Sequence, residues 1–123
     1  MIKDEGLGWR IARDPNRETY TTLIGGETWA FEITDPEWNS LSDLLNQLID
    51  QYKQIKNQLM KDEPIVLEIE KHPWKGFLEG DQFSWSLKLI LKSQEESRGV
   101  EMFWPSTVAE SVTLAMRKMW DSN

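Results

Sequence analysis

The chain has 123 residues, of which 39% are hydrophobic and 28% are charged, and it contains no cysteine. This composition excludes a disordered chain and a disulfide-stapled secreted domain, and no apolar run approaches the length of a membrane span. The net charge of −7, with both halves acidic, argues against sequence-independent nucleic-acid binding, which depends on neutralising phosphates. We expect a single cytoplasmic domain over residues 1–123, with no signal peptide because residues 1–6 lack an apolar core.

The first third of the chain predicts a three-stranded antiparallel meander. Strand-like segments run from Leu7 to Arg13, from Tyr20 to Ile24 and from Thr28 to Ile33. Gly25-Gly26 predicts a tight turn between the second and third strands, because such a turn requires positive φ angles.

A long helix is predicted next. Thr34 and Glu37 have the spacing of a capping box, and a proline between them suits the first turn. A regular spacing of apolar residues then predicts about 25 residues of helix with one buried face. These apolar residues are Trp38, Leu41, Leu45, Leu48, Tyr52, Ile55 and Leu59.

The second half predicts about four more strands. Ile65 to Glu70 and Phe83 to Lys92 alternate between apolar and polar residues, with Phe83 on the apolar face. Phe77 to Glu79 and Gly99 to Trp104 predict shorter strands.

A second helix closes the chain, and the order of elements predicts the fold class. Thr107 and Glu110 have capping-box spacing, so this helix is expected to begin near residue 106 or 107. The order is strands, helix, strands, helix, which predicts an α+β fold with antiparallel sheets and helices packed on one side.

Trp74 is the tryptophan whose setting suggests a function. It lies in a predicted loop with Lys71, His72 and Lys75, and an exposed indole flanked by cations is able to stack on a nucleobase. The alternative interpretation is an aromatic side chain that folds back and covers an open edge of the sheet.

Lys88 and Lys92 occupy the polar face of the strand predicted over residues 83–92. With Arg10 from an early strand they are candidates for a positive patch on an exposed sheet face, where sheet-type proteins bind single strands. The alternative is an ordinary solvated face, since Glu68 and Glu70 also point to a predicted polar face and would dilute the patch.

Recognisable catalytic motifs are absent from the sequence. His72 is the single histidine and cysteine is absent, which excludes the common zinc-ligand sets. No nucleophile-elbow or phosphate-loop motif occurs, and the acidic pairs Asp62-Glu63 and Glu95-Glu96 are interpreted as solvated loops. We therefore expect a protein that is not an enzyme and has no cofactor or metal.

Several short stretches, spread over nearly the whole chain, carry a resemblance. They are Gly8-Trp9-Arg10, Gly25 to Ala30, Glu32-Ile33-Thr34, Leu59 to Glu63, Ser86-Leu87-Lys88, Arg98 to Glu101 and Trp104-Pro105. The chain resembles a cyanobacterial family known as domain of unknown function 1818. The family is similar in fold to the plant Whirly single-stranded-DNA-binding domains, which repeat four strands and a helix twice.

This resemblance implies a fourth strand in the first group, for which Arg17 to Thr22 is the candidate segment. The Lys-Gly-Lys-Ala-Ala-Leu motif of Whirly proteins does not occur in this sequence. The resemblance therefore implies an architecture and supplies no functional residues.

Three functions remain open from the sequence. The first is a noncatalytic interaction module that binds a protein partner or itself, since the long helix is able to overhang a small sheet and serve a dimer. The second is single-stranded nucleic-acid binding through Trp74 and the lysine-bearing strand. The third is a small-ligand binder or enzyme with a pocket between helix and sheet. No membrane partner is expected.

Overall fold

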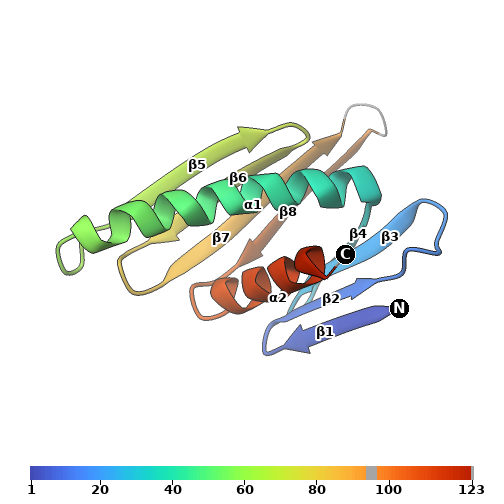
Figure 1. Cartoon of the computed structure of the whole chain (residues 1–123), viewed down its shortest axis with the longest axis horizontal. Coiled ribbons are helices and arrows are strands. Elements are labelled where there is room, and N and C mark those ends of the chain that lie inside the picture. The colour runs from blue at the N-terminus through green and yellow to red at the C-terminus, as the bar shows by residue number, and fades with distance from the viewer. Residues whose placement is uncertain (94–96, 123) are drawn as a thin grey trace.

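The computed structural model describes residues 1–93 and 97–122 (Figure 1). Within these residues the elements are β1 (Ile2–Gly6), β2 (Trp9–Arg13), β3 (Tyr20–Gly26), β4 (Ala30–Thr34), α1 (Asp35–Ile55), the 3-10 turn η1 (Lys56–Gln58), β5 (Ile65–Lys71), β6 (Trp74–Gly80), β7 (Trp85–Ser93), β8 (Arg98–Trp104) and α2 (Ala109–Asp121). The predicted acidic loop pair Glu95-Glu96 lies outside the described residues.

The strands form two antiparallel four-stranded sheets, with the orders β1-β2-β3-β4 and β5-β6-β7-β8. Helix α1 packs mainly against β5 and β6, and α2 packs against β7 and against β1 and β2. Figure 1 shows both helices on the same side of the sheets. The predicted α+β class and the order of strands, helix, strands, helix are therefore confirmed. Similarity to Whirly domains stays a prediction.

The first sheet has one strand more than its sequence predicted. The added strand is β1, and the segment from Arg17 to Thr22 does not supply it. Every residue of β1 is exposed, and Lys3, Asp4 and Glu5 place charges along this edge of the sheet. Because β1 has no buried face, its sequence shows no alternation of apolar and polar residues from which to predict a strand. Charges along an edge strand are a common protection against edge-to-edge association.

Gly25 and Gly26 lie within β3 and do not form the predicted turn. The turn follows them, where the N–H of Gly26 donates to the carbonyl of Trp29 over 2.9 Å. A Cβ on Gly26 would lie 2.3 Å from Nε1 of Trp29. Glycine is therefore required because the indole lies directly on the backbone at this position.

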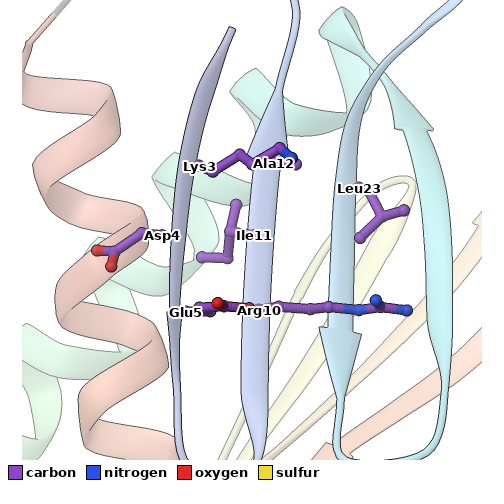
Figure 2. Close-up of a pocket in the computed structure, with 7 residues that line it drawn as sticks. All are labelled: Lys3, Asp4, Glu5, Arg10, Ile11, Ala12 and Leu23. Atoms are coloured by element: carbon purple, nitrogen blue, oxygen red, sulfur yellow. The ribbon is translucent and has the colours of Figure 1, made fainter.

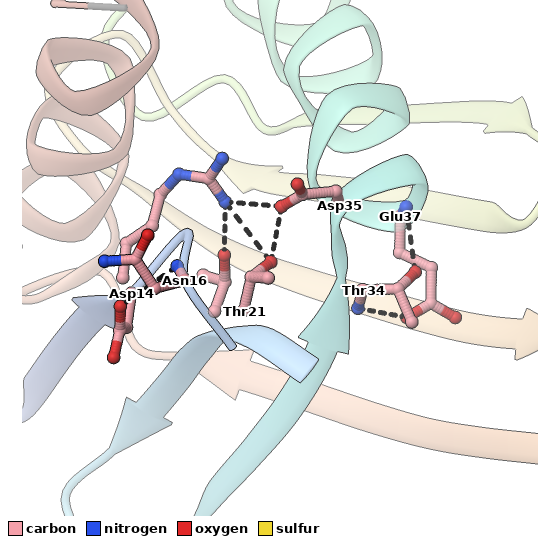
Figure 3. Close-up of polar contacts among 8 residues, drawn as sticks. Asp14, Asn16, Thr21, Thr34, Asp35 and Glu37 are labelled. Carbon is pink, nitrogen blue, oxygen red and sulfur yellow. Dashed lines mark hydrogen bonds and ion pairs between the residues drawn. The ribbon is translucent and has the colours of Figure 1, made fainter. Parts of the chain in front are cut away.

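Helix α1 begins with the predicted capping box. The Thr34 N–H donates to Glu37 Oε1 over 2.9 Å, and the Glu37 N–H donates to Thr34 Oγ1 over 3.3 Å (Figure 3). The helix ends at Ile55 and continues as a 3-10 turn, so it is shorter than predicted. Its apolar stripe is buried from Trp38 to Tyr52.

A polar network beside this helix start was not predicted. Arg13 Nη1 donates to Asp35 Oδ1 over 2.8 Å and to Thr22 Oγ1 over 2.9 Å, and the Thr21 hydroxyl also donates to Asp35 (Figure 3). These hydrogen bonds, from Thr21 first and Arg13 second, lower the pKa of Asp35 below its usual value. The network joins β2 and β3 to the first turn of α1.

Two predictions about the second half of the chain are wrong. Phe83 was expected on an apolar strand face, but it is 69% exposed in a turn where Asp81 Oδ1 accepts from the N–H groups of Phe83 and Ser84. The predicted Thr107–Glu110 capping box does not form, because α2 begins at Ala109 and its N-cap residue is Val108, which offers no side-chain cap. The carbonyl of Pro105 accepts from the first N–H groups of this helix instead.

Candidate interaction face

The side of the second sheet that faces away from the helices carries Lys75, Lys88 and Lys92, three of the seven predicted site residues. Alternate residues of β5–β8 are buried under the helices, and the residues between them form the opposite face. Strand register aligns two rows across this face. The rows are Glu68, Phe77, Lys88 and Phe103, and Glu70, Lys75, Ile90 and Glu101. We call these eight residues the outer face.

Aromatic rings and lysines alternate in the middle of the outer face. Lys88 Nζ lies 4.5 Å from the ring centroid of Phe77, and Lys75 Nζ lies 5.5 Å from it. Phe103, on the edge strand β8, is 51% exposed. The face therefore offers apolar contact area as well as charge.

Each of these two lysines is paired with a glutamate on a neighbouring strand. Lys75 Nζ lies 2.8 Å from Glu68 Oε1, and Lys88 Nζ lies 3.6 Å from Glu101 Oε1. The hydrogen bond with Glu68, helped by the negative charge of that carboxylate, raises the pKa of Lys75 above its usual value. The positive charge that the sequence predicted on this strand face is thus largely neutralised by the two glutamates.

Several of the predicted residues surround one cavity at the end of the outer face. His72, Lys75 and Lys92 line a cavity of about 230 Å³, together with Glu70 and the edge of Trp74. His72 and Lys92 are exposed. The neighbouring Lys71 is turned toward α1, where its Nζ lies 3.7 Å from Asp43 Oδ2.

Trp74 is not the exposed loop residue that the sequence suggested. It is the first residue of β6 and is 1% exposed, and its Nε1 donates to the carbonyl of Glu37 over 2.8 Å. The prediction of an exposed stacking platform at Trp74 is therefore wrong. The alternative, an aromatic side chain that covers an open edge of the sheet, does not describe its position either, because β6 is an inner strand and the indole bonds to the first turn of α1.

Arg10 lies apart from Lys88 and Lys92, because it belongs to β2 in the first sheet. Figure 2 shows its side chain extending from β2 across β3. There it covers Gly25, where a Cβ would lie 2.9 Å from Arg10 Cγ. Arg10 lines a separate hollow of about 570 Å³ with Lys3 and Glu5, so the predicted patch shared with β7 does not form.

Phe77 and Phe103 are the aromatic residues of this face, and the sequence analysis did not select either of them as a site residue. A signal was present in β8, where Val100, Met102 and Trp104 alternate with Glu101 and Phe103. That alternation places Phe103 on the polar face with Glu101. Phe103 shares this face with Phe77 and Ile90, and a group of exposed apolar residues, unlike a single one, indicates a contact surface.

Two properties of the described residues bear on other classes of function. Residues 1–93 and 97–122 contain no group of three or more His, Cys, Asp or Glu side chains arranged to hold a metal ion. In the same ranges, neither helix combines the length and the apolar character needed to cross a bilayer.

Comparisons with known proteins place this fold in a family. Residues 4–119 match the family described as Domain of unknown function (DUF1818). A crystal structure of a protein with unknown function from the DUF155 family, from the cyanobacterium Prochlorococcus sp. NATL2A, is 52% identical in sequence. The match covers 98% of this chain and 99% of that chain, with a TM-score of 0.91. The curated proteins contain no match.

Proposed function

We propose that this chain, which belongs to the DUF1818 family, is a noncatalytic interaction module that pairs with a second copy of itself through the outer face. The observation that carries the proposal is the composition of that face. Phe77, Ile90 and Phe103 offer apolar area, and charges of both signs stand between them. The proposed compartment is the cytoplasm, because a cysteine-free chain needs no oxidising environment.

Charge balance favours a second copy as the occupant. The chain carries a net charge of −7, so two copies repel each other over most of their surfaces. The outer face holds two lysines and three glutamates and is therefore nearly neutral. A face with both signs is also able to complement itself across a two-fold axis, as isologous dimers require.

The size of the face sets the expected strength of the dimer. Four strands about 4.8 Å apart and about seven residues long cover roughly 19 by 23 Å. This is about half of the 800 Å² that each partner buries in a standard interface. We therefore expect a reversible dimer with a dissociation constant on the order of 10–100 µM.

Sedimentation velocity over a range of about 5–500 µM, which brackets this constant, tests the proposal. The wild-type chain should shift from monomer to dimer, and Phe103→Glu should remain a monomer because it replaces an exposed apolar side chain of the contact with a charge. Phe83→Glu is the matched control, since Phe83 is also an exposed phenylalanine but lies in the turn before β7 and is not part of the outer face. A wild-type chain that is monomeric at 500 µM, or a Phe103→Glu variant that still dimerises, would overturn the proposal.

Single-stranded nucleic-acid binding is the second candidate, favoured by one observation. Lys75 and Lys88 flank the Phe77 ring, which is the combination of cation and aromatic that binds single strands on sheets. The paired glutamates Glu68 and Glu101 oppose it. Anisotropy of a labelled single-stranded oligonucleotide, measured at low salt and at about 150 mM, separates the two functions, because phosphate contacts weaken as salt rises. The Lys88→Glu variant should lose any such binding.

A further inference from the structure

Helices α1 and α2 enclose a groove of about 190 Å³ on the side of the molecule opposite the outer face. Its apolar lining comes from both helices and from the sheet below them, through Ile49, Tyr52, Leu114 and Trp85. Trp85 is 5% exposed and its ring lies 6.0 Å from that of Tyr52, whereas Leu114 is 55% exposed. The groove thus has an aromatic floor and an open, apolar rim.

Three basic side chains also line the groove, beside these apolar residues. Lys53 comes from α1, Lys56 from the 3-10 turn and Arg117 from α2. In the part of the chain that the structure describes, none of them forms an ion pair, whereas Glu110 is the single acidic residue that lines the groove. An excess of positive charge on a chain of net charge −7 indicates a site for an anion.

A buried hydroxyl of the groove also lacks a partner. Thr113 lines the groove and is 3% exposed, and among the described residues no group hydrogen-bonds its Oγ1. The other hydroxyl of the groove is already engaged, since Tyr52 donates to the carbonyl of Asp81 over 2.8 Å. Buried polar atoms without a partner are rare in folded proteins, so this hydroxyl is an unsatisfied group in the wall of the groove.

We propose that this groove binds a small organic anion with a short apolar tail, of the class of aryl and alkyl carboxylates. The tail packs against Trp85 and Leu114, and the carboxylate lies among Lys53, Lys56 and Arg117. The volume corresponds to about six water molecules and is below the range of pockets for drug-sized ligands, so the ligand is small.

Titration of the full-length, nitrogen-15-labelled chain with 3-phenylpropionate, followed by NMR, tests this site. Saturable shifts are expected at Trp85 and along residues 49–56 and 110–117. The dissociation constant should be on the order of 1 mM, as for other ligands with about eleven non-hydrogen atoms. The neutral analogue 3-phenylpropionamide has the same shape and should bind about tenfold more weakly, because it lacks the charge that the three cations recognise.

Charge variants locate the binding within the groove. Arg117→Gln should weaken 3-phenylpropionate binding about tenfold, the effect of one charged hydrogen bond. Lys118→Gln, at the adjacent and exposed position of α2, removes the same charge outside the groove and should leave affinity unchanged. Shifts that do not saturate, an amide that binds as tightly as the acid, or equal losses in the two variants would each overturn the proposal.

Discussion

The Glu37 carboxylate and the Arg98 guanidinium lie 2.7 Å apart and join the first turn of α1 to the first residue of β8. The same carboxylate oxygen accepts the capping hydrogen bond from the N–H of Thr34, and Arg98 Nη2 donates to the carbonyl of Glu32. The Glu37 side chain is 7% exposed and that of Arg98 is 14% exposed. Because no β-ladder joins the two described sheets, this pair is a principal polar tie between the halves of the chain.

Arg98→Met should destabilise the protein by about 3–5 kcal/mol, because it leaves the Glu37 carboxylate buried without its partner. Urea unfolding monitored by circular dichroism measures the change in the free energy of unfolding. Arg17→Met is the matched control. It breaks an exposed ion pair with Glu32 at 3.3 Å and should cost less than about 1 kcal/mol. Equal losses in both variants would contradict the role assigned to Arg98.

Trp74→Phe should cost about 1 kcal/mol more than Trp38→Phe. Both indoles are buried, but Trp74 Nε1 donates to the Glu37 carbonyl, whereas Trp38 Nε1 has no hydrogen-bond partner among the described residues. The two substitutions remove the same volume, so the difference in the free energy of unfolding isolates one buried hydrogen bond. A larger loss for Trp38→Phe would show that packing dominates at both positions.

Thr113→Val should raise the free energy of unfolding by about 1 kcal/mol, because it removes a buried hydroxyl that has no partner among the described residues. Thr21→Val is the control at an equally buried threonine whose hydroxyl donates to Asp35, and it should destabilise the protein. Thermal unfolding compares the two.

The Asp35 carboxyl should contribute to stability at neutral pH and lose that contribution in acid. Its pKa in the folded protein lies below the usual 3.8, so as pH falls the unfolded chain binds the proton first. The contribution is complete above about pH 5 and disappears as pH falls through the lowered pKa. Its size should stay under about 1 kcal/mol, because the Asp35 side chain is 47% exposed.

Unfolding measured between about pH 2 and pH 7 tests this dependence. Asp35→Asn should show a smaller loss of stability in acid than the wild-type chain. Asp50→Asn, at an exposed position of α1, is the control and should follow the wild-type curve. Parallel curves for Asp35→Asn and the wild-type chain would remove Asp35 from the acid response.

The sequence predicted the elements whose signals are local and failed where the signal came from a distant part of the chain. The start of α1 is read from Thr34 and Glu37, which are three residues apart and bond to each other. Trp74 was predicted in a loop, although it begins a strand that continues through Gly76. In the fold Gly76 lies under α1, where a Cβ would be 2.8 Å from Leu48 Cδ1. Glycine is required at this inward position of β6 because α1 packs directly on it, and the sequence alone does not show that contact.

The candidate sites also combine features with a local signal in the sequence and features that depend on distant parts of the chain. Lys75 and Lys88 were selected from the sequence, but their neutralisation by Glu68 and Glu101 depends on cross-strand register, which a single sequence does not define. The groove between the helices was not predicted at the level of residues. Its cations come from segments more than fifty residues apart, such as Lys53 and Arg117, and only the packing of α2 beside α1 brings them together.

The order of the strands also has a kinetic consequence. Every hydrogen-bonded strand pair among the described residues joins strands that are consecutive in the chain, so each sheet closes only short loops. Proteins with such local pairing have low contact order and fold quickly for their strand content. The long-range step is the docking of α2 on β1 and β2, which joins opposite ends of the sequence. We expect both meanders to form early and the return of this last helix to limit the rate of folding.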